Sequence, residues 1–281
     1  MKKTVLASAL ALAVTGAFAP SAAAGGYSYF RAGFENVTYD EHYPGISSSV
    51  TVTSPVINTG GLYYVNPFLD FSLEALATFS PGSSQEDWYD AKGLMQTNKY
   101  QYLRTSTNAL LHFKMTPQWR IVAGPAFSYQ THKRFGKESF RPPLPEGTHE
   151  FFTNTWEETS TDIFLDMGIA YDTGTLSNAS PWQYQFRAIY GLPIWSYTTN
   201  TAAGLEEATF YESGHRANLE AGFSYRVYPG VSVGAFFNAT YENREQSDVV
   251  IVTVDDKRYS AVVPEADTWH YSAGVQLLWN F

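Results

Sequence analysis

The last thirteen residues, Trp269 to Phe281, constrain the fold of this chain more than any other stretch. Apolar residues alternate here with small or polar ones, and only Leu278 breaks the pattern; the apolar positions are Tyr271, Ala273, Val275, Leu277, Trp279 and Phe281. Alternation with a period of two predicts a β-strand with one apolar face. A strand in a soluble protein usually has about 5–6 residues, whereas a tilted strand that crosses a bilayer needs about 9–11. This stretch is therefore long enough to cross a membrane.

The first 24 residues predict a secretory signal peptide. Lys2 and Lys3 precede an apolar run over 5–18, and three alanines at 22–24 provide a cleavage site. A transmembrane anchor is the alternative, but the apolar run has about 14 residues and a spanning helix needs roughly 20. We expect a mature domain over 25–281. Its formal charge is −11, because cleavage removes two lysines from a chain of net charge −9.

The composition excludes several classes of protein. An acidic chain lacks the basic face that binds phosphate, so we expect no nucleic-acid partner. The sequence has no cysteine, no dense histidine cluster and no phosphate-binding loop, so we expect no metal and no cofactor. Beyond the signal peptide there is no run of 18 apolar residues, while aromatic residues make up 16% of the chain. Alternating hydrophobicity with many aromatic residues favours a β-barrel with aromatic girdles.

The same alternation recurs along the chain and predicts about ten strands, with 8 to 12 possible. The expected strands cover 27–39, 52–65, 69–79, 100–115, 119–134, 153–171, 182–198, 209–227, 231–241 and 269–281. Short turns at 66–67, 116–118 and 228–230 alternate with longer loops, including 40–49 and 81–97. Pro125 predicts a local bulge, and 249–254 with 259–263 predict a hairpin beyond the membrane. The fold class is an all-β, antiparallel, up-and-down transmembrane barrel.

The polar faces of these strands distinguish a barrel from a soluble β-sandwich, which also has one apolar face per strand. The apolar faces contain no charged residue, whereas the opposite faces contain Arg31, Glu35, Asp70, Glu74, Arg104, Arg120, Asp162, Asp166, Arg187, Glu220, Arg226 and Glu242. The basic members are all arginine, which favours confined pairing with carboxylates. We expect these residues to form a polar network inside the lumen. A ten-stranded barrel filled in this way has at most a narrow solute passage.

The alternating terminal strand with a final aromatic residue resembles the C-terminal assembly signal of Gram-negative outer-membrane β-barrel proteins. The likeness rests on Tyr271, Val275, Leu277, Trp279 and Phe281. It implies an outer-membrane location, with the barrel-assembly machinery, periplasmic chaperones, outer-membrane lipid and lipopolysaccharide as partners. An even number of strands places both termini in the periplasm. We expect a monomer.

A partial likeness to the omptin proteases concerns the predicted outer loops. The segment 85–90 resembles the acidic segment of omptins, although Gln85 replaces its first acid and Asp87 alone matches. Asp40 and His42 have the spacing of the omptin Asp-His pair, but they occur in the first loop instead of the fourth. The resemblance implies Asp40, His42 and Asp87 as catalytic residues around a water. The alternative is that they are solvated loop residues.

The sequence thus predicts an outer-membrane barrel with a surface structural or binding role, and a non-enzymatic role is favoured. An omptin-like surface endopeptidase and a small selective channel are the alternatives. The channel would require arginines on one side of the lumen and acids on the other.

Overall fold

The computed structural model describes residues 25–140, 155–173, 180–202, 205, 208–254 and 256–281. The predicted signal peptide lies outside the described residues, as do the first two residues of the strand predicted over 153–171. Among the described residues, no helix is long and apolar enough to cross a membrane.

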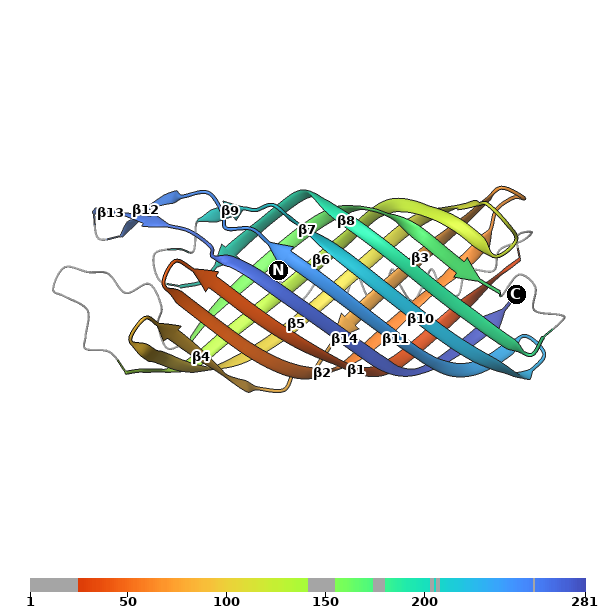
Figure 1. Ribbon diagram of the computed structural model, residues 1–281, viewed down its shortest axis with the longest axis horizontal. Coiled ribbons are helices and arrows are strands. Elements are labelled where there is room, and N and C mark those ends of the chain that lie inside the picture. Colours follow the sequence, from red (N-terminus) through yellow and green to blue (C-terminus); the bar gives the residue numbers. More distant parts are fainter. Residues whose placement is uncertain (1–24, 141–154, 174–179, 203–204, 206–207, 255) are drawn as a thin grey trace.

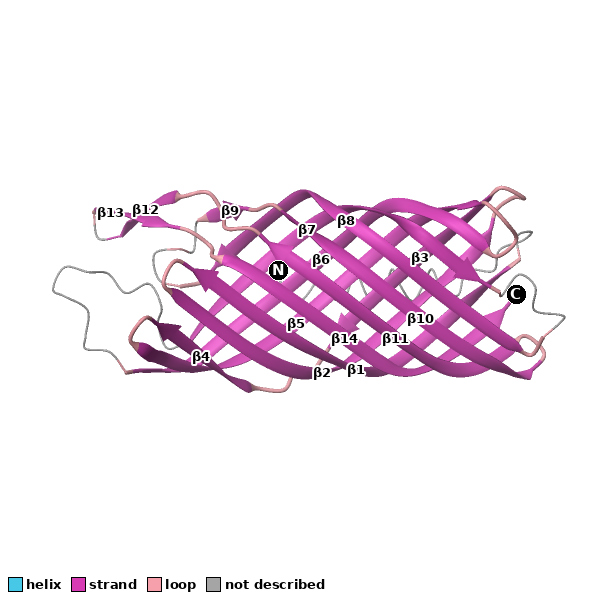
Figure 2. Ribbon diagram, viewed as in Figure 1, coloured by secondary structure: helices cyan, strands magenta, loops and turns pink. Residues whose placement is uncertain are grey.

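The described chain is an antiparallel sheet closed into a barrel, with strongly tilted strands (Figures 1 and 2). Ten long strands form the wall of the described part: β1 (Gly26–Tyr43), β2 (Ile46–Tyr64), β3 (Leu69–Thr78), β5 (Gly93–Lys114), β6 (Trp119–Ser139), β7 (Thr155–Asp172), β8 (Trp182–Asn200), β10 (Gly214–Tyr228), β11 (Val231–Arg244) and β14 (Glu265–Asn280). Four short strands extend the wall or stand beyond it: β4 (Ser84–Asp90), β9 (Thr209–Tyr211), β12 (Val250–Val254) and β13 (Lys257–Ala261). The predicted fold class and strand number are confirmed.

The barrel closes where the first and last strands pair. β1 and β14 run antiparallel in unbroken register from Tyr27 opposite Asn280 to His42 opposite Glu265. At the end of the pair, the amide of Gly26 donates to the carbonyl of Phe281 at 3.2 Å. Closure removes the last free strand edges of the wall, as a transmembrane barrel requires. We call this end of the barrel the terminal end, and the end with the β12–β13 hairpin the loop end (Figure 1).

Leu278, the exception to the alternation, faces inward. It is 1% exposed and packs against Tyr27, Tyr29 and Leu62 just inside the terminal end. The apolar residues Tyr271, Val275 and Leu277 are instead 42–64% exposed on the outer surface. Leu278 therefore belongs to a small apolar cluster inside the lumen, at a height where the other inward residues are polar.

Aromatic side chains form two girdles on the outside of the barrel. Near the terminal end Trp119 lies 5.0 Å from Tyr171, and near the loop end Tyr241 lies 4.7 Å from Trp269, measured between ring centroids. The exposed side chains between the girdles are apolar, among them Phe34, Leu165, Phe223 and Val275. An apolar band between aromatic girdles matches the surface that contacts a bilayer.

The wall continues past the loop-end girdle, because strands extend into segments predicted as loops. β1 and β2 reach a tight turn at Pro44 and Gly45, where Gly45 has a positive φ of 81°. After a break at 79–83, β4 continues the line of β3 between β2 and β5. The loops predicted over 40–49 and 81–97 are thus wrong. These strands were not predicted because their outward faces are polar, since this part of the wall lies beyond the apolar band.

Pro125 causes no bulge, which corrects a second expectation. β6 keeps one register with β7 through Pro125 opposite Leu165 and with β5 on both sides of the proline. The ladder between β5 and β6 instead lacks pairing at Ala109 and Leu110, opposite the proline. Because Pro125 has no N–H to donate, this local gap in the β5–β6 ladder accommodates it.

The predicted hairpin beyond the membrane is confirmed as β12 and β13, paired from Val250–Ala261 to Val254–Lys257. It packs on a small apolar core at the loop end, which contains Trp156, Leu205, Phe210, Val252 and Val263. β9 and the hairpin are therefore held to the wall of β7 by their own cluster.

Candidate functional site

The lumen contains ion pairs that connect different strands. Near the terminal end, Asp70 on β3 accepts from Arg120 on β6 at 3.0 Å and forms an ion pair with Lys114 on β5 at 2.6 Å. Asp70 and Arg120 are fully buried. We expected every basic residue of the lumen to be arginine, and Lys114 is an exception. It lies at the terminal end, where its long side chain extends toward solvent.

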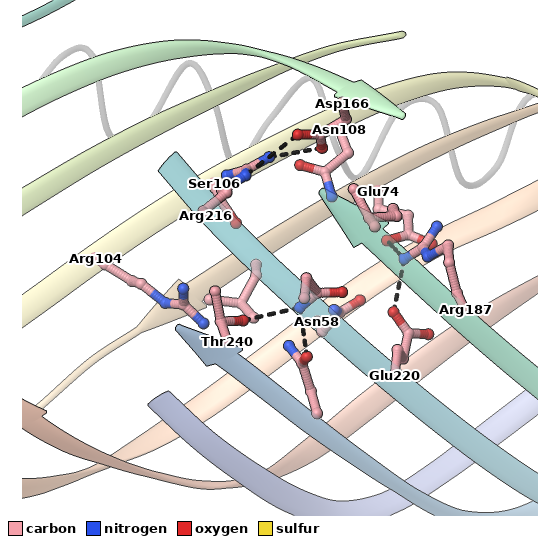
Figure 3. Close-up of a pocket in the computed structure, with 14 residues that line it drawn as sticks. Asn58, Glu74, Arg104, Ser106, Asn108, Asp166, Arg187, Arg216, Glu220 and Thr240 are labelled. Atoms are coloured by element: carbon pink, nitrogen blue, oxygen red, sulfur yellow. Dashed lines mark hydrogen bonds and ion pairs between the residues drawn. The ribbon is translucent and has the colours of Figure 1, made fainter. Parts of the chain in front are cut away.

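A chain of four charges crosses the lumen in its middle. Arg31 on β1 binds Glu220 on β10 at 2.6 Å, and Arg187 on β8 binds the other oxygen of Glu220 at the same distance. Arg187 also binds Glu74 on β3, on the opposite wall (Figure 3). Two arginines and two glutamates compensate each other, which offsets the cost of burying each charge.

Further toward the loop end, Arg104 binds Glu35 at 2.6 Å and Arg216 binds Asp166 at 2.7 Å. Arg216 was not among the predicted lumen residues. Asp162 is inward as predicted, but its partner is the hydroxyl of Ser196 and not an arginine.

Arg226 has a backbone partner near the terminal end. It lies at the terminal end of β10 and donates to the carbonyl of Ser180 in the connection before β8, at 2.7 Å. It lies opposite Ser232, which is fully buried, so these two residues share the inward face of the wall.

Cavities separate the layers of ion pairs. One of them has about 510 Å³ of space between its lining atoms, open solvent included, and is bordered by Arg104, Asp166, Arg187, Arg216 and Glu220 (Figure 3). A second lies toward the terminal end and shares Glu74, Arg187 and Glu220 with it, so the central chain of charges forms the partition between them.

A second set of charges closes the loop end, and we call it the mouth cluster: Glu41, Glu86, Arg134, Glu158, Glu212 and Arg244. Arg134 on β6 binds Glu41 on β1 at 2.6 Å and Glu86 on β4 at 2.8 Å. Arg244 on β11 binds Glu158 on β7 at 2.8 Å and the hydroxyl of Tyr39 at 2.8 Å. Four carboxyl groups surround two guanidinium groups, so the cluster has two more acids than bases.

The surplus of acid changes the protonation of the mouth cluster, which lies beyond the apolar band. Burial raises the pKa of Glu212 to about 7, more than the nearby Arg244 lowers it. Burial likewise raises the pKa of Glu41, against the effect of Arg134. Although burial acts in the same direction on Glu158, Arg244 and Arg134 together hold its pKa below the usual range. One or two protons are therefore held in this cluster at pH values where free glutamates are ionised.

The mouth cluster escaped the sequence analysis because Glu41 and Glu86 fall in segments predicted as loops. The signal that locates them is the continued alternation: Tyr39 and Glu41 keep the inward parity of Arg31 and Glu35.

The predicted catalytic residues lie on the outside of the barrel. Asp40 is opposite Ser49, and Ser49 is opposite Asp87, so the two acids share one row with β2 between them. Two strand spacings separate them by roughly 10 Å. His42 lies two residues further along β1 toward the loop end, opposite Ser47. A general base must reach its proton across a hydrogen bond or one water, so this arrangement does not assemble the site that the omptin resemblance implies.

The described residues contain no group of three or more His, Cys, Asp or Glu side chains arranged to hold a metal ion.

No family model matches the chain, and a search of curated proteins finds no similar sequence. Among solved structures, the chain is similar to the outer membrane protease OmpT from Escherichia coli, with a TM-score of 0.62, 10% identity and coverage of 93% of this chain and 99% of that chain. The translocator domain of the autotransporter NalP from Neisseria meningitidis also matches, with a TM-score of 0.37, 9% identity and coverage of 100% and 96%. OprG from Pseudomonas aeruginosa matches with a TM-score of 0.36, 12% identity and coverage of 91% and 97%. Identities this low establish the fold alone, and the argument rests on the first match. The chain therefore has the fold of the Gram-negative outer-membrane β-barrel proteins.

Proposed function

We propose that the chain is an integral outer-membrane protein with a surface structural or binding role and a lumen closed to general diffusion. The apolar band between two aromatic girdles supports a membrane location. The terminal end then faces the periplasm, so that both termini lie there, and the loop end faces the outside. Outer-membrane lipid and lipopolysaccharide are the proposed contacts of the wall, and the assembly machinery and periplasmic chaperones are its proposed partners in biogenesis.

The observation that carries the proposal is the connection of opposite walls by ion pairs. Glu74 and Arg187 join β3 to β8, Arg134 and Glu41 join β6 to β1, and Arg244 and Glu158 join β11 to β7. Removing one partner of a buried pair costs about 3–5 kcal/mol. A solute that separated these pairs would meet costs of the same order, so the pairs resist passage as well as unfolding.

The test is conductance in planar bilayers. The refolded protein is expected to give no large, stable steps. Replacing Arg31, Glu74, Arg187 and Glu220 together by serine removes two charges of each sign and joins the two cavities that these side chains separate, so conductance is expected to rise. Large, stable steps from the unaltered protein would contradict the proposal.

A small selective channel is the second candidate, because cavities lie on both sides of the central charges. The expected arrangement, with arginines on one side and acids on the other, is not found among the central pairs. Arg31 on β1 and Glu74 on β3 lie on either side of β2, and Glu220 and Arg187 lie on the adjacent strands β10 and β8 across the lumen. Small, ion-selective steps in the same recordings would favour the channel over the closed barrel.

A further inference from the structure

The wall of the barrel is interrupted between β8 and the chain that leads into β10. The β8–β10 ladder ends with Gly191 opposite Arg216, and pairing resumes on β9 with Tyr197 opposite Tyr211. Between these points the amide of Glu212 donates to the carbonyl of Ser196 at 3.3 Å, and the ladder has no pairing at 192–195. We call this interruption the wall gap.

Local sequence explains the wall gap. Pro193 has no N–H to donate to a neighbouring strand. Ile194 is an extra residue on β8, since Ile163 of β7 is opposite Trp195 and Phe164 is opposite Pro193. This bulge turns two consecutive side chains outward, with Ile194 65% and Trp195 45% exposed. On the other side, Gly214 has a φ of 145°, and a Cβ there would lie 2.1 Å from the carbonyl oxygen of Asn243.

A cavity lies directly inside the wall gap. It has about 410 Å³ of space between its lining atoms, open solvent included, and it is bordered by Pro193 and Ser196 on one side of the gap and by Ser213 on the other. Ser213, which lines the cavity at the gap, is exposed to solvent. We call this cavity the side pocket. It lies at the height of Tyr241 and Trp269, which is the loop-end girdle.

The side pocket is acidic. Asp162 and Glu242 line it, and Asp162 is 5% exposed. One oxygen of Asp162 accepts from Ser196, while the other, Oδ2, is buried without a hydrogen-bond partner among the described residues. Gln130 donates to Glu242 at 2.6 Å. Arg244 also lines the pocket, but it is engaged by Glu158 and Tyr39. A buried carboxylate oxygen with no donor has the chemistry to receive a cation.

We propose that the side pocket binds the ammonium group of an amphiphilic primary amine, which enters from the outer leaflet through the wall gap. Asp162 and Glu242 supply the counter-charge, and the hydroxyl of Thr268 is a further acceptor in the lining. The alkyl chain stays in the bilayer against Ile194 and Trp195. A backbone ladder interrupted at the bilayer boundary is consistent with this, because unpaired backbone groups are tolerated there where they border a polar cavity.

The first test is binding of dodecylamine to the barrel in lipid nanodiscs, measured in excess of empty nanodiscs. Saturable binding is expected, and dodecanol, which has the same chain without the charge, is expected to show none. Butylamine reports the route of entry. Binding of butylamine as tight as that of dodecylamine would mean access from the aqueous mouth and would overturn lateral entry.

Variants identify the site. Asp162→Asn removes the carboxyl group that would give up its proton to face the ammonium and keeps an oxygen for Ser196, so we expect at least tenfold weaker binding. Asp87→Asn, the same change on the outer surface, is expected to leave binding unchanged. Ile194→Ser is expected to weaken dodecylamine binding, while Val275→Ser, at an equally exposed position on β14 (64%), is not.

Unchanged binding in folded Asp162→Asn protein would overturn the proposal. If that variant does not fold, as judged by heat-modifiable migration, the comparison of Ile194→Ser with Val275→Ser decides: equal effects overturn lateral entry. Conductance is a separate measurement, so failure here does not depend on whether the lumen is closed.

Discussion

The protonation of Glu212 predicts how the loop end responds to pH. Glu212 lies between β9 and β10, its Oε2 accepts from Thr198 at 2.8 Å, and its Oε1 lies 3.6 Å from Nε of Arg244. Its pKa in the folded protein is about 7, whereas a free glutamate has a pKa of about 4.3. A raised folded pKa means that the folded loop end binds a proton which the opened one releases.

The sign follows from that difference. The stabilisation by bound protons is fully present below about pH 4.3 and is lost as the pH rises through about 7. One proton changes the free energy of opening by up to about 1.4 kcal/mol per pH unit. Between pH 5 and 7 the loss is about 2 kcal/mol, or roughly a 40-fold increase in opening if Glu212 becomes fully solvated.

Two neighbours do not obscure the effect. The lowered pKa of Glu158 has the opposite sign, so its contribution is lost below about pH 4.3, outside this window. Glu41 has a raised pKa, but it belongs to β1 and stays in the wall when the β9 segment opens.

The assay is amide hydrogen exchange of residues 208–213, corrected for the intrinsic dependence of exchange on pH. Opening is expected to increase 10- to 100-fold from pH 5 to pH 7, while residues 105–113 in β5 stay unchanged. Glu212→Gln mimics the protonated group and is expected to flatten the profile. Glu245→Gln, at an exposed acid that accepts from Ser213, serves as the control. An equal slope in the Glu212→Gln and unaltered proteins would refute the reasoning.

Three further predictions concern assembly and stability. Phe281→Ala is expected to slow assembly, because the Phe281 ring packs 5.8 Å from the ring of Tyr63. Truncation from Trp269 is expected to abolish assembly. Normal heat-modifiable migration of the truncated chain would count against the closed barrel. Gly274→Ala is expected to impair folding, since a Cβ there would lie 2.2 Å from the carbonyl oxygen of Ala32. In Gly222→Ala the new Cβ would meet flexible glutamine side chains at 3.1 Å or more, so this variant is expected to fold. Equal refolding yields of the two variants would argue against the close approach of β1 and β14. Arg134→Ala is expected to destabilise the barrel by about 3–5 kcal/mol in urea unfolding, because Glu41 and Glu86 lose their shared partner, and a loss below about 1 kcal/mol would contradict that role.

Much of the fold could be predicted because alternation is a local property. Residues 269–281 alternate in the sequence and form β14 in the structure, and their predicted pairing with the first strand is confirmed from Tyr27 to Tyr39. Alternation along each strand also assigned most of the lumen residues to the correct, inward face. The prediction failed where the outward face stopped being apolar, as at Asp40, His42 and Asp87, which belong to strands and not to loops.

The partners of the lumen charges could not be predicted in the same way. Arg187 is distant from Glu74 in the sequence, and they meet because β8 and β3 face each other across a closed barrel. Which residues share a height depends on strand tilt and register summed around the ring. The mouth cluster and the side pocket arise from the same geometry, together with one extra residue at Ile194.

The sequence by itself therefore determined a membrane-spanning β-barrel and the face on which each long strand carries its charges, because both depend on a two-residue period along one strand. The tertiary structure decided which acid meets which base, where the wall is interrupted, and that Leu278 faces the lumen, because these depend on how ten strands close on one another.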